Sequence, residues 1–267
     1  MDYILLNNKV KIPQLGIGGF AQGTHEITEA LQIGYRLIDT AAQYGNEEEI
    51  GQAIRKSGIP REEIFLSTKL WTEDIRKRKT REAFFDSLKR LGTSFVDMFL
   101  IHWPADGFVD AWLEMERLYQ EGYIRAIGVS NCHRLHLEQI ENVASVIPAV
   151  NQIESHPRFK NQELIDYCKV KGIQVEAWCP LGGAYGCILE ESDITEIAKE
   201  YGKTPAQIVL KWHMQRRIIT FPKSSHRERM KSNFDIFSFE LSERDMKRID
   251  ALDSGCRIGA NPENFDF

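Results

Sequence analysis

Residues 34–49 read GYRLIDTAAQYGNEEE and join a short apolar run to the start of a helix. Residues 36–39 have the length and apolar content of a buried strand. Asn46 can cap a helix whose first turn holds three consecutive glutamates, and acidic side chains there suit the positive end of the helix dipole. The stretch therefore predicts one strand followed by one helix.

The same pairing of a short apolar run with a helix-like segment recurs along the chain. The predicted strands are residues 15–18, 36–39, 64–69, 96–102, 126–130, 149–152, 173–178 and 218–221. Strands that alternate with helices form parallel sheets, because parallel neighbours need a crossover connection. Eight such units in 267 residues favour a closed (β/α)8 barrel over an open sheet. We therefore predict one α/β domain, a TIM barrel that spans residues 1–267.

Two smaller elements are predicted to flank this barrel. Asn7 and Asn8 lie between two short apolar runs and predict an N-terminal β-hairpin. Residues 242–252 predict an extra C-terminal helix. Within the barrel, Thr204 and Gln207 have the spacing of a capping box, with Pro205 at the first helical position. These local signals agree with the barrel architecture.

Composition excludes several classes of partner. The chain has 34 Lys and Arg against 39 Asp and Glu, a net charge of -5, so a nucleic-acid partner is not expected. No apolar run approaches the roughly 18 residues that span a bilayer, and the first residues have no basic leader, so we expect a cytoplasmic protein without a membrane partner. The five cysteines form no CxxC pair, as is typical of free thiols in a reducing compartment.

Six predicted strands end in a residue that the interior of a barrel does not explain. A single such residue is more often structural than functional. The carboxyl ends of the strands form the active-site face of a TIM barrel, so six of them with mixed chemistry indicate a site there. These strand-end residues are Asp39, Lys69, His102, Ser130, Gln152 and Trp178.

Four residues at this face form a set suited to proton transfer. The hydroxyl of Tyr44 has an ordinary pKa of about 10, and a neighbouring Lys69 ammonium favours the phenolate and lowers that pKa. Asp39 would keep the lysine charged inside the barrel. His102 can donate a hydrogen bond to a carbonyl oxygen. The set could protonate a carbonyl as a hydride arrives from a nicotinamide.

At these residues the chain resembles the aldo-keto reductase family, in particular the small prokaryotic type similar to 2,5-diketogluconate reductase. The resemblance covers nearly the whole chain. Any one of the matching segments is weak evidence, whereas the ordered series is specific. The segments are residues 12–16 (IPQLG), 34–41 (GYRLIDTA), 44–47 (YGNE), 67–71 (STKLW), 101–104 (IHWP), 128–131 (GVSN), 150–154 (VNQIE), 180–182 (PLG) and 221–224 (FPKS).

The resemblance implies NADPH-dependent reduction of aldehydes or ketones to alcohols. It implies a catalytic tetrad of Tyr44, Lys69, Asp39 and His102, with Tyr44 as the general acid. It also implies that NADPH (oxidised form NADP+) contacts Ser130, Asn131, Gln152, Trp178, Leu181, Lys223, Ser224, Arg229 and Asn233. A small carbonyl compound would bind against Phe20, Trp71 and Trp103. We expect no metal ion, and a monomer.

The sequence departs from the family pattern at a few positions. His226 stands where relatives often have Thr or Arg, and Ser232 where they usually have an acidic residue, which weakens the inference for NADPH over NADH. The loops after Phe20 and after Trp103 are short. Because these loops rim the pocket, a more open mouth is expected.

Three alternative interpretations have weaker support from the sequence. A short-chain dehydrogenase is suggested by residues 16–21 (GIGGFA), which fit GxGxxA, and by Tyr167 and Lys171 at YxxxK spacing with Ser155 upstream. A regulatory protein could bind NADPH without turnover, although the intact tetrad argues against it. Cys132, His133 and His136 suggest a metal, yet no fourth ligand lies at a suitable spacing.

Overall fold

The computed structural model describes residues 2–183 and 187–267 and contains a barrel of parallel strands. The strands lie in the order β10-β9-β8-β7-β6-β5-β4-β3. The barrel closes where the Gly16 amide donates to the Thr220 carbonyl (2.9 Å) and the Thr220 amide donates to the Gln14 carbonyl (3.1 Å). The strands are β3 Ile17–Gly18, β4 Leu37–Asp39, β5 Phe65–Leu70, β6 Val96–Ile101, β7 Ile124–Ser130, β8 Val150–Glu154, β9 Gln174–Trp178 and β10 Ile219–Thr220.

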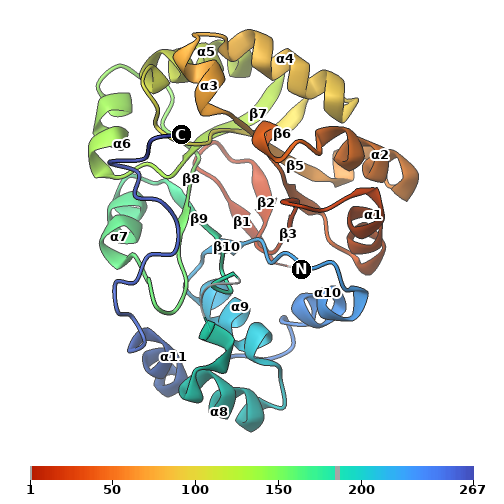
Figure 1. Cartoon of the computed structure of the whole chain (residues 1–267), viewed down its shortest axis with the longest axis vertical. Coiled ribbons are helices and arrows are strands. Elements are labelled where there is room, and N and C mark those ends of the chain that lie inside the picture. Colours follow the sequence, from red (N-terminus) through yellow and green to blue (C-terminus); the bar gives the residue numbers. More distant parts are fainter. Residues whose placement is uncertain (1, 184–186) are drawn as a thin grey trace.

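Helices surround the strands and cover the outside of the barrel (Figure 1). Within the described ranges, no helix is both long and apolar enough to cross a membrane. The ring of parallel strands with helices on its outside confirms the predicted TIM barrel. The helices are α1 Thr24–Ile33, α2 Glu47–Ser57, α3 Thr72–Arg76, α4 Thr80–Leu91, α5 Phe108–Gln120, α6 Arg134–Glu141, α7 Gln162–Val170, α8 Ser192–Tyr201, α9 Pro205–Gln215, α10 Arg227–Phe234 and α11 Glu243–Asp250.

The predicted N-terminal hairpin is present and packs inside one end of the barrel. Strands β1 (Tyr3–Leu5) and β2 (Lys11–Pro13) pair antiparallel. Asn7 and Asn8 at its turn donate hydrogen bonds to the backbone carbonyls of Pro148, just before β8, and of Arg125, at the start of β7. Apolar hairpin side chains join a core cluster with residues from the strands, so the amino ends of the strands are plugged and the site is left to the carboxyl ends. This cluster contains Ile4, Leu6, Ile12, Leu37, Phe65, Met98, Leu100, Ala126, Ala149, Val150, Ile219 and Phe221.

The predicted capping signals give different results. Thr204 and Gln207 form the capping box of α9, with Pro205 at the first position, as predicted. Asn46 precedes α2, but its side chain makes no cap hydrogen bond. Instead its Nδ2 donates to the carbonyls of Gly19 (2.7 Å) and Gln22 (2.8 Å). The asparagine therefore fastens the loop between β3 and α1, which is a long-range contact that no local pattern reveals.

The chain after α11 runs back along the barrel. The extra C-terminal helix is confirmed as α11, and no helix or strand follows it. In Figure 1 this terminal segment, drawn in dark blue, passes α7 and α6 before it ends near β8. It brings the last residues of the chain to the carboxyl ends of the strands.

Candidate active site

The four residues of the predicted tetrad meet at the carboxyl ends of neighbouring strands. Asp39 is the last residue of β4, Lys69 lies near the end of β5 and His102 follows β6. Tyr44 ends a short 3-10 helix, Ala42–Tyr44, in the loop after β4. Because β4, β5 and β6 are adjacent in the barrel, the carboxyl ends of three strands bring these side chains together.

Lys69 is the centre of this group. Its side chain is fully buried, and its Nζ donates to Asp39 Oδ2 (2.7 Å), to the Thr40 carbonyl (2.9 Å) and to the Tyr44 hydroxyl (3.4 Å). An ammonium group has three donors, so each has an acceptor. Burial disfavours the charge, but attraction to Asp39 and Tyr44 outweighs it and raises the pKa of Lys69. The lysine is thus held as a fixed cation beside the tyrosine.

Tyr44 stays protonated in this setting. Burial raises the pKa of its hydroxyl above the usual value, and the positive charge of Lys69 opposes that rise without cancelling it. The acidifying effect expected of Lys69 is therefore present, but the net direction is upward. Because burial depends on the folded chain, residue types alone predicted a lowered pKa for Tyr44, which is the opposite direction.

His102 is uncharged and close to both aromatic neighbours. Burial, followed by the charge of Lys69, lowers its pKa well below the ordinary value. Its ring lies 5.7 Å from that of Tyr44 and 5.2 Å from that of Trp71, both edge to face. Neither ring nitrogen has a hydrogen-bond partner among the described residues. A neutral imidazole with a free N–H can donate a hydrogen bond to a ligand.

The residues predicted to hold a nicotinamide form one connected group. Asn131 follows β7 with a positive φ of 58°, and its side chain donates to the His102 carbonyl (3.0 Å). It also accepts a hydrogen bond from the Trp178 indole (2.8 Å), while Ser130 Oγ donates to the Gln152 carbonyl (2.9 Å). Leu181 lies in the loop after β9 and packs against the core. The tryptophan ring is therefore fixed beside the tetrad.

The cations predicted to bind phosphate differ from their neighbours. Among the described residues, Lys223 and Arg229 take part in no ion pair, whereas Arg227 pairs with Glu29 (3.3 Å). These two exposed cations, one in the segment before α10 and one in the first turn of that helix, have no ion-pair partner among the described residues and fit a phosphate group. Ser224 and Asn233 lie nearby but are buried. The Ser224 hydroxyl bonds both the amide and the carbonyl of His226, which shapes the turn before α10.

The aromatic wall of the mouth includes residues that the sequence did not indicate. Phe20 is 62% exposed and packs edge to face on Tyr44. Trp71 stacks on Phe267 at 5.7 Å with nearly parallel rings, and Trp103 contacts both Phe265 and Phe267. The C-terminal segment thus contributes to the wall that the short loops were expected to leave open. Aromatic residues in an irregular segment carry no periodic signal, so their place at the mouth could not be predicted.

Glu154 anchors that C-terminal segment. This buried carboxylate at the end of β8 accepts the backbone amides of Ile258 (2.5 Å) and Gly259 (3.1 Å) and pairs with His156 (3.1 Å). Burial opposes ionisation, but these donors outweigh it and lower the pKa of Glu154. A carbon atom added at Gly259 would lie 2.4 Å from the Trp178 ring, so only a glycine lets the segment pass so close.

Gln152 lies deeper than expected. It was predicted to end its strand, but β8 continues to Glu154, and Gln152 sits two residues before that end. There it is in register with Glu176 of β9 and donates to both Glu176 and Asp39. Glu176 was not singled out in the sequence, because one glutamate in an apolar strand has no motif of its own.

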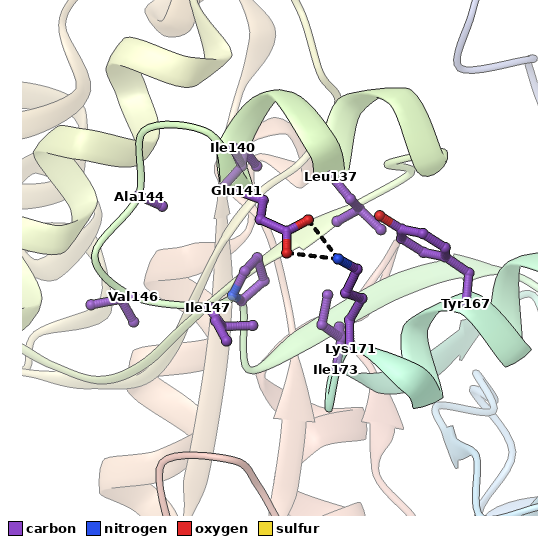
Figure 2. Close-up of a pocket in the computed structure, with 10 residues that line it drawn as sticks. Leu137, Ile140, Glu141, Ala144, Val146, Ile147, Tyr167, Lys171 and Ile173 are labelled. Carbon is purple, nitrogen blue, oxygen red and sulfur yellow. Dashed lines mark hydrogen bonds and ion pairs between the residues drawn. The ribbon is translucent and has the colours of Figure 1, made fainter.

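The features that suggested other protein classes lie elsewhere. Figure 2 shows Tyr167 and Lys171 beside a surface hollow between α6 and α7, where Lys171 pairs with Glu141. Residues 16–21 belong to the first barrel strand and its loop, which is incompatible with a Rossmann sheet. In the described ranges, no group of three or more His, Cys, Asp or Glu side chains is placed to bind a metal ion.

Comparison with known proteins identifies the family of this chain and agrees with the fold. The family model described as Aldo/keto reductase family matches residues 24–254. A glyoxal reductase of Bacillus subtilis is 45% identical over 100% of this chain and 98% of its own length. A methylglyoxal reductase of Escherichia coli is 40% identical over 95% and 94%, respectively.

The fold also matches that of a solved aldo-keto reductase structure. An aldo-keto reductase from a deep-sea metagenome library of the Medee basin superposes with a TM-score of 0.96 at 43% identity, covering 99% of this chain and 100% of that one. Fold and sequence therefore give the same family. The protein is a member of the aldo-keto reductase family of oxidoreductases, whose enzymes use nicotinamide cofactors.

Proposed function

We propose that this chain reduces small aldehydes or ketones to alcohols with NADPH, and that Tyr44 donates the proton. The observation that carries this proposal is the hydrogen bond from the buried Lys69 ammonium to the Tyr44 hydroxyl, with Asp39 holding the ammonium from the other side. Such a group is suited to releasing a proton from a tyrosine without leaving an unpaired charge in the barrel.

The proposed mechanism divides the reaction between the cofactor and the chain. A reduced nicotinamide, when bound, supplies a hydride to the carbonyl carbon. The Tyr44 hydroxyl gives its proton to the carbonyl oxygen, and the Lys69 ammonium stabilises the phenolate that remains, since its Nζ lies 3.4 Å from that oxygen. His102, being neutral, donates a hydrogen bond to the same carbonyl oxygen and does not compete as an acid.

The remaining site residues would bind the cofactor. Trp178 would stack on the nicotinamide ring, with Ser130, Asn131 and Gln152 bonding its carboxamide. Lys223 and Arg229 would bind the 2′-phosphate, with Leu181, Ser224 and Asn233 along the rest of the molecule. All of these residues come from one chain, so a monomer suffices.

Small dicarbonyl compounds are the proposed substrates. Two similar proteins are named for reduction of glyoxal and methylglyoxal. In this chain, Phe20, Trp71, Trp103 and the C-terminal Phe267 surround the mouth. We expect NADPH to be consumed with glyoxal and methylglyoxal, with a higher kcat/KM than with a bulky steroid ketone. Binding of NADPH without turnover of any carbonyl compound would favour the regulatory alternative.

The preference for NADPH has its own test. Arg229→Ala should raise the Kd for NADPH about tenfold or more, because it removes a charged partner of the 2′-phosphate, and should change the Kd for NADH less than about threefold. The matched control is Arg227→Ala, since Arg227 already pairs with Glu29. Titration of protein fluorescence with each nucleotide measures both constants. Equal weakening of NADPH and NADH by Arg229→Ala would contradict the phosphate role.

A further inference from the structure

A buried glutamate lies directly behind the proposed active site. Glu176 is in the middle of β9, is fully buried and pairs in register with Gln152 of β8. The amide nitrogen of Gln152 donates to Glu176 Oε2 (3.0 Å) and to Asp39 Oδ1 (2.9 Å). A continuous chain of hydrogen bonds therefore runs from Tyr44 through Lys69, Asp39 and Gln152 to Glu176.

This arrangement fixes which way the Gln152 amide is turned. A primary amide has two N–H donors on nitrogen and a carbonyl oxygen that only accepts. Both donors are taken by carboxyl oxygens. An amide oxygen in the same place would face the negatively charged Asp39, which is paired with Lys69 and cannot donate a hydrogen bond. The carbonyl oxygen Oε1 of Gln152 has no hydrogen-bond donor among the described residues. It is therefore the atom left to accept a hydrogen bond from a ligand.

Two carboxyl groups, those of Asp39 and Glu176, lie near one buried cation, the ammonium of Lys69. Asp39 on β4 bonds Lys69 directly, whereas Glu176 bonds only the Gln152 amide, and its Oε1 has no partner in the described part of the chain. Burial raises the pKa of Glu176 to about 8, and the charge of Asp39 adds to this rise. Glu176 therefore accepts the Gln152 hydrogen bond as a neutral acid at pH 7. It adds no second negative charge beside Lys69.

We propose that Glu176 is a positioning residue that acts through Gln152: together with Asp39 it holds both N–H groups of the Gln152 amide and reserves the amide's carbonyl oxygen for the ligand. The ligand group that fits is a primary amide, whose N–H donates to that oxygen. Its identification as the carboxamide of a nicotinamide rests on the proposed function. Glu176 itself touches neither substrate nor cofactor in this role.

The protonation of Glu176 makes this role dependent on pH. The charged groups that act on it are Asp39 from β4 and Lys69 from β5, while its register partner on β10 is the apolar Ile219. Ionisation of Glu176 places a second negative charge next to the Gln152 amide and strengthens that hydrogen bond. The environment of the Gln152 amide protons should therefore change near pH 8.

The first experiment uses the chain without ligand. The side-chain amide of Gln152 is followed by nitrogen-15 NMR and assigned by its loss in Gln152→Met. In the wild type we expect slow hydrogen exchange and a chemical shift that titrates near pH 8. Glu176→Gln keeps an acceptor oxygen, so slow exchange should remain and the titration should disappear. Glu176→Leu removes the acceptor, so exchange should become at least tenfold faster.

The second experiment measures binding of NADPH to the same proteins. At pH 7, Glu176→Gln should bind within about threefold of the wild type, and Glu176→Leu about tenfold more weakly. The control is Glu116→Gln, a buried glutamate of α5 that holds the amides of Ser145 and Val146 and should alter neither Gln152 exchange nor binding.

The outcomes separate the two proposals. If the wild type bound no nicotinamide nucleotide, the proposed function would fail, while exchange in the ligand-free chain would still test Glu176. A wild-type Gln152 amide that does not titrate, or a Glu176→Leu variant with slow exchange and unchanged NADPH binding, would overturn the role of Glu176. If Glu176→Leu does not fold, the loss of titration in Glu176→Gln decides the question.

Discussion

Two tyrosine–lysine pairs occur among the residues that the structure describes, and only one of them has the surroundings of an active site. At the barrel mouth, Lys69 Nζ lies 5.0 Å from the centre of the Tyr44 ring, and in the outer hollow Lys171 Nζ lies 5.8 Å from that of Tyr167. The side chain of Lys69 is fully buried, whereas that of Lys171 is 35% exposed. Similar residue types at similar separations therefore have different physical meaning.

The two pairs differ in which groups accept hydrogen bonds from the lysine ammonium. Lys69 donates to the Tyr44 hydroxyl itself, so its charge acts on the proton that would be transferred. Lys171 Nζ donates to both carboxylate oxygens of Glu141, at 2.6 and 2.7 Å. The Tyr167 hydroxyl has no hydrogen-bond partner among the described residues. Water also screens the outer pair. Of these two pairs, only the one at the mouth has a buried lysine that donates to the tyrosine hydroxyl.

The largest expected difference between the pairs is in turnover. Tyr44→Phe removes the proposed proton donor and should lower kcat by about a thousandfold or more, while NADPH binding stays within about threefold. Tyr167→Phe is the matched control and should change kcat less than twofold. Steady-state consumption of NADPH with methylglyoxal measures both. Near-normal turnover in Tyr44→Phe would remove the basis for the proton-donor assignment.

The next difference is in stability. Lys69→Met leaves the buried Asp39 without its cation and should lower the free energy of unfolding by about 3–5 kcal/mol. Lys171→Met breaks an exposed pair and should cost less than about 1 kcal/mol. Denaturant unfolding of each variant measures these changes. Adding Asp39→Asn to Lys69→Met should restore part of the loss, and a double variant as unstable as the single one would contradict this explanation.

Much of the barrel could be predicted because its signals are local. Alternating strand and helix patterns, the Thr204 capping box and the polar strand ends each depend on residues close in sequence. The contact of Asn46 with Gly19 and Gln22 could not be predicted, because an asparagine before a helix looks like a cap whatever its side chain reaches. Local patterns give the elements of this fold and leave the links between them undetermined.

The candidate site shows the same limit at the level of chemistry. Asp39, Lys69 and His102 could be found because polar residues at strand ends are conspicuous in a barrel. Glu176 and Phe267 could not, because their importance arises from burial against β8 and from the return of the chain end to the mouth. The upward net shift in the pKa of Tyr44 also depends on burial. Residue types indicate which chemistry is available, and packing decides its direction.

A smaller difference is expected in the pH dependence of stability, between Glu176 near the mouth pair and Glu141 in the outer pair. The pKa of Glu176 rises from 4.5 to about 8 on folding, so between these values the folded chain holds a proton that the unfolded chain has lost. Stability from this group is complete below pH 4.5 and is lost as the pH rises through 8. The contribution of this group to the free energy of unfolding changes by at most about 1.4 kcal/mol per pH unit.

Raising the pH from 6 to 7 should therefore destabilise the wild type by about 1 kcal/mol more than it destabilises Glu176→Gln, which cannot ionise. Glu141→Gln is the matched change in the outer pair, where the carboxylate is 51% exposed, and should alter stability by less than about 1 kcal/mol at either pH. Denaturant unfolding at the two pH values measures both effects. If the wild type and Glu176→Gln showed the same pH dependence, Glu176 would already be ionised at pH 6. Burial would then not be what distinguishes the acid behind the mouth from the acid in the hollow.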